Sequence, residues 1–282
     1  MYTYRNLEED FSRLASCGAR VGSIGRSLLG NEIYFAHTGS ESGSQIIVTG
    51  GIHARENVTS LLVVKQAYRH LRCAMGVYFV PMLNPDGAML IQGGCQKAGA
   101  YASLVKKING SNDFSLWKAN ARGVDLNNNF DAKFGLGKGN VTQPSSHGYV
   151  GEYPFSEPES SAIRDFTLKV NPIYTVSYHA KGREIYWYFG QTDCRDKSIA
   201  KRIARYLGYR RVDSDMQSAG GYKDWCILQG IPAVTIEIGK DSLLHPLSER
   251  DVKKDVERNL DLPKKIHEWS KKNYKQKEIV SK

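Results

Sequence analysis

Short apolar runs alternate along the chain with longer stretches in which apolar residues recur every three or four positions. Residues 46–49 are a β-branched run that ends at two glycines, and residues 77–82 are a second apolar run. Between these runs, Leu61, Val64 and Tyr68 fall on one face of a helix. The pattern predicts a strand, a helix and a second strand.

The same alternation returns in the second half of the chain. Ser156 and Glu159 have the spacing of a capping box, which predicts the start of a helix. The further predicted elements are strands at residues 173–178 and 233–238, a helix at 197–207, and a last helix at about 252–260 that is interrupted near Pro263. This order predicts an α/β fold with a central mixed, largely parallel twisted sheet covered by helices on both faces. Ligands of such folds bind at the carboxyl ends of the strands.

The region from about residue 93 to 149 has a different composition. It is rich in Gly, Asn, Ser and Lys and has little apolar periodicity, so we expect long functional loops there. Nothing in the sequence marks a linker between domains. We therefore expect one catalytic domain over residues 1–282.

Composition narrows the class of protein. The chain has 282 residues, of which 41% are hydrophobic and 24% charged, and it shows no repeat or heptad array, which excludes a disordered or fibrous protein. Its five cysteines are widely separated, as in a protein with reduced thiols. The first ten residues contain no apolar signal core, and no run approaches the roughly 18 residues that span a bilayer. These features predict a soluble cytoplasmic protein with no membrane partner.

Candidate chemistry begins directly after the first strong strand. His53 and Glu56 are three residues apart, so a turn that enters the following helix can direct both side chains to one point. This pair alone is weak evidence for a metal, because Glu56 would also stabilise an exposed helix start. His179 follows another predicted strand and would complete a three-ligand set. Glu237 lies within an apolar strand, where a carboxylate is costly unless it is paired or used.

Several longer motifs point to one family. They are GIHARE, NPDG, RGVDLNxN, YPFSEPE, SYHAKG, SAGGYKDW and TIEIG. In this order they resemble the zinc carboxypeptidases of the carboxypeptidase A-like family, from about residue 22 to residue 239. The resemblance implies a carboxypeptidase-like zinc peptidase fold with one zinc ion.

The resemblance also implies roles for individual residues in catalysis. His53, Glu56 and His179 would bind zinc and leave a fourth position for water. Asp125 would accept the second N–H of His53 and fix its tautomer. Glu237 would be the general base.

Four further residues would contact the substrate if the family pattern holds. Arg122 would stabilise the oxyanion, and Arg55 would bind substrate near the metal. Asn127 and Asn128 occupy the place of an Asn-Arg pair that clamps a free terminal carboxylate in digestive carboxypeptidases, and an amide cannot supply that charged fork.

Two departures from the family concern specificity. Lys223 lies where the family sets its side-chain preference, and a cation there favours an acidic group on the substrate. Without the surrounding motif, Lys223 would be taken for a solvated residue at a helix start. Met216 replaces a tyrosine of the digestive enzymes.

The motif set is most similar to bacterial peptidases that cleave the bond between the γ-carboxyl of D-glutamate and a diamino acid such as meso-diaminopimelate. We therefore predict a zinc-dependent peptidase that acts on peptidoglycan-derived peptides, either in the cytoplasm or on the cell wall after release. One alternative is a zinc carboxypeptidase that removes acidic C-terminal residues, motivated by Lys223. Another, from a different class, is a non-catalytic basic protein that binds cell wall or nucleic acid.

The net charge of +10 argues little for a nucleic-acid partner. Residues 264–282 contain seven Lys and two Glu, a net of +5, so half of the charge lies in this short C-terminal tail. The other 263 residues are close to an ordinary balance. We read the tail as a solvated helix end and expect no nucleic-acid partner; the sequence does not predict the oligomeric state.

Overall fold

The computed structural model describes residues 1–215 and 217–280, with side chains up to residue 271. Met216, the last two residues and the side chains of the predicted basic tail beyond residue 271 lie outside this description. The helices are α1 (Tyr4–Ser16), α2 (Asn57–His70), α3 (Pro85–Gly93), α4 (Ala102–Asn109), α5 (Pro158–Val170), α6 (Cys194–Leu207), α7 (Tyr222–Leu228), α8 (Glu249–Asn259) and α9 (Leu262–Val280). The strands are β1 (Arg20–Arg26), β2 (Glu32–Thr38), β3 (Gln45–Thr49), β4 (Gly76–Val80), β5 (Tyr174–Ala180), β6 (Glu184–Tyr186), β7 (Arg210–Val212) and β8 (Ala233–Ile238).

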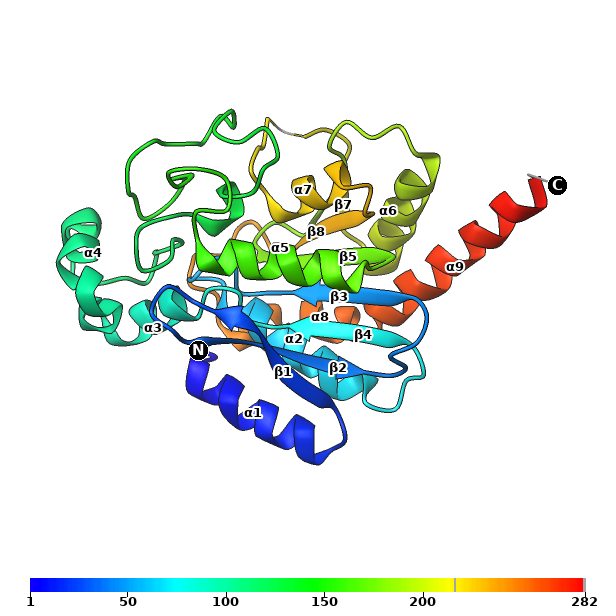
Figure 1. Ribbon diagram of the computed structural model, residues 1–282, viewed down its shortest axis with the longest axis horizontal. Coiled ribbons are helices and arrows are strands. Elements are labelled where there is room, and N and C mark those ends of the chain that lie inside the picture. Colours follow the sequence, from blue (N-terminus) through cyan, green and yellow to red (C-terminus); the bar gives the residue numbers. More distant parts are fainter. Residues whose placement is uncertain (216, 281–282) are drawn as a thin grey trace.

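The strands form one eight-stranded sheet in the order β1-β2-β4-β3-β5-β8-β6-β7 (Figure 1). Its central strands β4, β3, β5 and β8 run parallel. The contacts β1–β2, β2–β4 and β6–β8 are antiparallel, and the edge strand β7 is parallel to β6. The predicted mixed, largely parallel sheet is thus confirmed. Parallel strands bring their carboxyl ends to one edge of the sheet, where their loops can form a common site.

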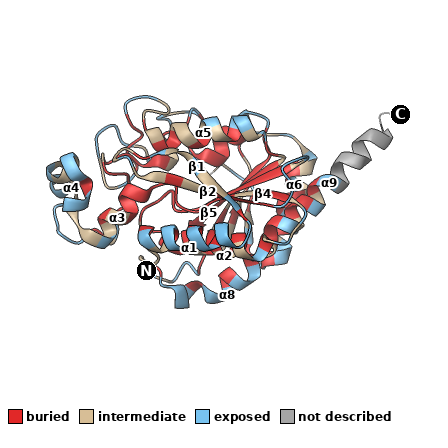
Figure 2. Cartoon of the chain, turned by 60° about the horizontal axis from the view of Figure 1, so that its bottom comes forward, coloured by how far each residue is buried: buried red, intermediate tan, exposed pale blue. Residues whose placement is uncertain are grey.

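Helices cover both faces of this sheet, and the strands are buried between them (Figure 2). Along β3, Ile46 and Val48 point into one core and Ile47 into the other, because successive side chains of a strand face opposite sides. The first core contains apolar residues of α1, α2, α6, α8 and α9, and the second contains residues of α5 and α7. Every residue of β3 is buried, which explains why this strand reads as an uninterrupted apolar run.

Two local predictions need correction. Helix α5 does not begin with a capping box: Glu157 precedes its first residue, Pro158, and makes no side-chain capping bond. Ser156 instead donates a hydrogen bond to the Glu157 carboxylate at 2.8 Å, so its hydroxyl is used outside the helix. The predicted loop region also contains helix α4 and two short 3₁₀ segments, Cys95–Tyr101 and Leu126–Asn128.

The interruption near Pro263 is confirmed, since α8 and α9 are separate helices on either side of residues 260–261. Proline is accepted there because it falls in the first turn of α9, where its missing N–H removes no helical bond. Among the described residues, no helix is both long enough and apolar enough to cross a bilayer.

Candidate metal centre and active site

The loop between β3 and α2 carries the first two predicted ligands. Gly51 opens it with φ +60°, and a Cβ there would lie 2.5 Å from the Ser60 hydroxyl, so the tight turn requires glycine. The Gly51 N–H donates to the Thr59 hydroxyl at 2.8 Å, and this hydroxyl donates to the Glu56 carbonyl at 2.7 Å. These bonds fasten the loop to the first turn of α2 and fix the position of Glu56.

The side chains of His53, Glu56 and His179 converge, with one potential ligand atom from each lying within 4.8 Å of the others. His53 Nδ1 lies 2.9 Å from Glu56 Oε1 and 3.2 Å from His179 Nδ1. The Ala180 N–H donates to Glu56 Oε2 at 3.2 Å and helps to orient the carboxylate. The histidines facing Glu56 hold the pKa of its carboxyl well below the usual range, although burial alone would raise it.

Asp125 orients His53 from behind. Its Oδ1 lies 3.2 Å from His53 Nε2, and its Oδ2 accepts the Gly148 N–H at 2.9 Å. Burial opposes the charge of Asp125, but Lys118, His53 and these hydrogen bonds outweigh it and hold the pKa of its carboxyl far below the usual value. Asp125 is therefore an acceptor, so Nε2 of His53 is the donor and its Nδ1 keeps a lone pair.

This arrangement fits a zinc ion. The lone pair of His53, the Glu56 carboxylate and a ring nitrogen of His179 face one point, and such a group of acceptors is stable only around a cation or shared protons. Two histidines and one glutamate are the protein ligands of catalytic zinc sites that keep one position open.

Glu237 lies beside these ligands. It is the register partner of His179 across the parallel strands β5 and β8, so both side chains emerge on the same face at the carboxyl ends of their strands. Its Oε2 is buried and has no hydrogen-bond partner among the described residues. Burial and the neighbouring charge of Glu56 raise the pKa of Glu237 to about 8. A divalent cation held by the ligands would oppose the effect of Glu56.

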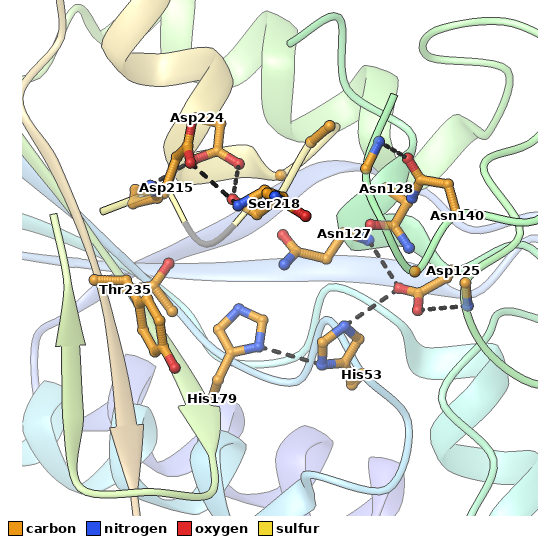
Figure 3. A pocket seen from close by; sticks show the side chains of 18 of the residues that line it. His53, Asp125, Asn127, Asn128, Asn140, His179, Asp215, Ser218, Asp224 and Thr235 are labelled. Carbon is orange, nitrogen blue, oxygen red and sulfur yellow. Dashed lines mark hydrogen bonds and ion pairs between the residues drawn. The ribbon is translucent and has the colours of Figure 1, made fainter. Parts of the chain in front are cut away.

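A cavity of about 380 Å³ opens beside the ligands, and His53, His179, Asp125 and Glu237 line it (Figure 3). Asn127 and Asn128 line the same cavity, as predicted. The loop before α7 adjoins this part of the wall and packs so closely that a Cβ on Gly220 would lie 2.4 Å from the Asn128 carbonyl oxygen. No arginine is among the described residues that line the cavity.

The structure does not bring Arg122 to this cavity. Its guanidinium binds Glu157, with Nη2 2.8 Å from Oε1 and Nε 3.3 Å from Oε2, and it also donates to the Ser156 carbonyl. The Glu157 side chain is only 1% exposed, so this ion pair neutralises a buried carboxylate. The expectation that Arg122 faces the reacting carbonyl is therefore not met in this structure.

Lys118 is a cation of the site that was not predicted from the sequence. It lines the cavity, and its Nζ lies 3.7 Å from Asp125 Oδ2. The Ala54 N–H donates to the Lys118 carbonyl at 3.1 Å, which fastens this segment to the loop that carries His53. Lys118 belongs to the irregular region that we expected to be functional, but no spacing rule connects it with the ligands.

Lys223 lines the cavity, as the resemblance implied, but its charge is already used. It forms a short ion pair with Asp224 and donates to the Tyr188 carbonyl at 2.9 Å. The prediction that Lys223 acts as a free cation is therefore not supported, because its neighbour Asp224 neutralises it. Arg55 is not among the cavity-lining residues; its Nη1 lies 3.5 Å from the Leu116 carbonyl, and its Nε is buried without a partner among the described residues.

Comparisons with known proteins agree with this site. The zinc carboxypeptidase family matches residues 4–261. Gamma-D-glutamyl-L-diamino acid endopeptidase 1 of Lysinibacillus sphaericus is 31% identical over 273 residues, which are 89% of this chain and 68% of that protein. Murein peptide amidase A of Escherichia coli is 26% identical over 222 residues, 76% of this chain and 78% of that protein.

Solved structures show the same fold. Bovine thrombin-activatable fibrinolysis inhibitor, solved in complex with a tick carboxypeptidase inhibitor, superposes with a TM-score of 0.74 at 22% identity, over 95% of this chain and 97% of that one. Several curated relatives are longer, and the chain spans 59% of bovine carboxypeptidase A1. The matched residues include the whole convergent cluster and the sheet that carries it, so this chain is a hydrolase of the zinc carboxypeptidase family.

Proposed function

We propose that the protein hydrolyses the bond between the γ-carboxyl of D-glutamate and a diamino acid in bacterial cell-wall peptides. The observation that carries this proposal is the cavity wall at Asn127 and Asn128, where no arginine is available to bind a terminal carboxylate. A substrate can therefore continue beyond the diamino acid. The similarity to a γ-D-glutamyl-diamino acid endopeptidase supports the same choice.

In this proposal, His53, Glu56 and His179 hold one zinc ion, and Asp125 keeps His53 in the tautomer that binds it. Zinc in such a site polarises the scissile carbonyl and makes water more acidic. Glu237 accepts the proton of the attacking water at Oε2 and later delivers it to the leaving amine. The pKa of about 8 for Glu237 holds without a cation; a bound zinc ion would lower it, so that the carboxylate would be ionised near neutral pH and could accept this proton.

We assign the stabilisation of the oxyanion to Lys118 in place of Arg122. Lys118 lines the cavity on the His53 side, and its side chain is 23% exposed, so its charge acts in a partly dry site. Arg122 is held by Glu157 and lies outside the lining. The ammonium of Lys118 can move from Asp125 to the oxyanion, because the Asp125 carboxylate would still be paired with His53 and the Gly148 N–H.

Arg55 is proposed to bind the acyl side of the substrate. It precedes the ligand Glu56 in the chain and is not among the described residues that line the cavity. Its Nε is buried and has no partner among the described residues, so an acidic group of the D-glutamyl residue that reached it would supply the missing acceptor.

The test is hydrolysis of the tetrapeptide L-alanyl-γ-D-glutamyl-diaminopimelyl-D-alanine and of its C-terminal amide by zinc-loaded protein, followed by mass spectrometry. We expect release of L-alanyl-D-glutamate from both peptides at similar rates. The Glu237→Gln variant, purified in parallel, controls for contaminating peptidases. Release of D-alanine, lost on amidation, would instead establish a carboxypeptidase, and no cleavage of either peptide would overturn the proposal.

A further inference from the structure

Two lysine–aspartate pairs lie around Phe189 at the end of the cavity away from the metal ligands. Lys223 Nζ lies 5.5 Å from the centroid of the Phe189 ring, and Lys133 Nζ lies 4.8 Å from it. Lys223 pairs with Asp224, and Lys133 Nζ lies 3.4 Å from Asp215 Oδ2. In Figure 3, Asp215 and Asp224 lie close together, away from His53 and His179.

The two pairs differ in how easily they can open. The side chains of Lys223 and Asp224 are 8% and 3% exposed, and Lys223 also donates to the Tyr188 carbonyl. Separating two buried charges is costly, so this inner pair is a fixed part of the wall. The side chains of Lys133 and Asp215 are 55% and 33% exposed, and an exposed pair of this kind contributes little stability. This outer pair can exchange its partners for those of a ligand.

Asp215 is prepared to face a ligand. It lines the cavity, and its Oδ1 accepts the Gln217 N–H at 3.1 Å, which fixes the carboxylate while Oδ2 remains directed to Lys133. The backbone hydrogen bond from Gln217 and the charges of Lys133 and Lys223 lower the pKa of Asp215, so it stays ionised at neutral pH. A ligand that displaces Lys133 must therefore bring a positive charge to Asp215, and a ligand that also satisfies Lys133 must bring a negative one.

A diamino acid offers these charges in one group. When diaminopimelate is joined to D-glutamate through one amino group, its distal carbon keeps an ammonium and a carboxylate side by side. Lysine in the same place keeps only the ammonium, and norleucine keeps neither. Of these side chains, only that of diaminopimelate replaces both partners of the outer pair.

We infer that Asp215, which lines the cavity, and Lys133, which pairs with it from just outside the lining, form the subsite for the distal head group of the diamino acid, with its ammonium on Asp215 Oδ2 and its carboxylate on Lys133 Nζ. The inference rests on the proposed function and names the substrate class within it. Lys223, which the resemblance pointed to, then shapes the wall together with Asp224 and does not itself bind the acidic group. Peptides whose distal amine is acylated, as in cross-linked wall, are poor substrates for such a subsite.

The test compares three peptides, L-alanyl-γ-D-glutamyl-X, with diaminopimelate, lysine or norleucine at X. We expect kcat/KM to fall by about tenfold from diaminopimelate to lysine and by about tenfold again to norleucine, mainly through KM. Asp215→Asn should lower kcat/KM by about tenfold for diaminopimelate and lysine but leave norleucine unchanged. Lys133→Gln should affect diaminopimelate alone.

Asp131→Asn and Lys138→Gln are matched controls, because both residues are exposed and lie in the same loop region but neither belongs to the Lys133–Asp215 pair. Equal hydrolysis of the three peptides by the unaltered protein would overturn the subsite and leave the proposed function standing. An equal loss on all three peptides in Asp215→Asn would also overturn it, since a structural role would act in that way. Hydrolysis of none of the peptides would overturn the proposed function itself.

Discussion

The two ends of the cavity are built in different ways. At the metal end, His179 and Glu237 stand on neighbouring parallel strands, and the side chains of His53, Glu56 and Asp125 are at most 7% exposed. His53, Glu56 and Asp125 are each held by another ionisable group or by a backbone N–H. At the outer end, the Lys133–Asp215 pair lies on loops and is a third to a half exposed.

This difference separates chemistry from recognition. Groups at the ends of buried strands cannot move without disturbing the sheet, so their geometry is already set when substrate arrives. Loop residues with exposed, weak ion pairs can be replaced or rearranged at little cost in stability. We therefore expect substitutions at the metal end to change turnover or metal binding, and substitutions at the outer end to change the choice of substrate.

The largest effect is expected for Glu237→Gln. The amide has nearly the same shape but cannot take a proton, so kcat should fall by about 10²–10⁴-fold. Zinc content should be unchanged, because Glu237 is not in the convergent ligand cluster. Steady-state kinetics on the diaminopimelate peptide and metal analysis of the same sample measure both quantities.

The matched control for this change is Glu257→Gln, which alters an exposed glutamate of α8 far from the cavity lining. Its kcat should equal that of the unaltered protein. If the Glu237→Gln variant keeps both its zinc and its turnover, Glu237 is not the base, and substitutions at the metal end do not always change turnover or metal binding.

A second test compares the two candidate cations. Lys118→Met should lower kcat by about 10²-fold or more, as expected when a donor to the developing oxyanion is lost. Arg122→Gln should leave kcat almost unchanged but lower the unfolding free energy by about 1–3 kcal/mol, because Glu157 loses its charged partner. Kinetics and thermal unfolding of the two variants distinguish the roles. A large fall in kcat for Arg122→Gln with none for Lys118→Met would return the oxyanion role to Arg122.

The residues at the metal end could be predicted from the sequence because the strands that carry them could be predicted. The buried strands at residues 46–49, 173–178 and 233–238 are largely apolar, so an ionisable residue that follows or interrupts them is placed there for a purpose other than contact with solvent. The parallel arrangement of β3, β5 and β8 then brings His53, His179 and the strand residue Glu237 together without further information. The sheet topology is thus the step that turns a sequence pattern into a cluster.

The pairing of charges was not predictable in the same way. The resemblance to the family implies an oxyanion role for Arg122, but in the structure its guanidinium binds Glu157, a buried carboxylate that is distant in sequence. Lys223 was treated as free because sequence does not show that Asp224 turns back toward it. The partner of a charged side chain depends on which loops pack together, and the loops here are the least periodic part of the chain.

The smallest effect is expected when an aspartate is replaced by asparagine, once at each end of the cavity. These two variants also compare the two ends most directly. The Asp125→Asn variant keeps an oxygen for His53 Nε2 but loses the negative charge. Its amide N–H would face the Gly148 N–H and Lys118, which are both donors. Zinc affinity should therefore fall by about 10–100-fold. Asp215→Asn removes the same charge at the outer end and should leave zinc affinity unchanged. Competition with a chelator of known affinity measures the zinc dissociation constant of both variants. An equal loss of zinc affinity in both would show that the two ends act as one unit, because the outer loop would then contribute to holding the metal.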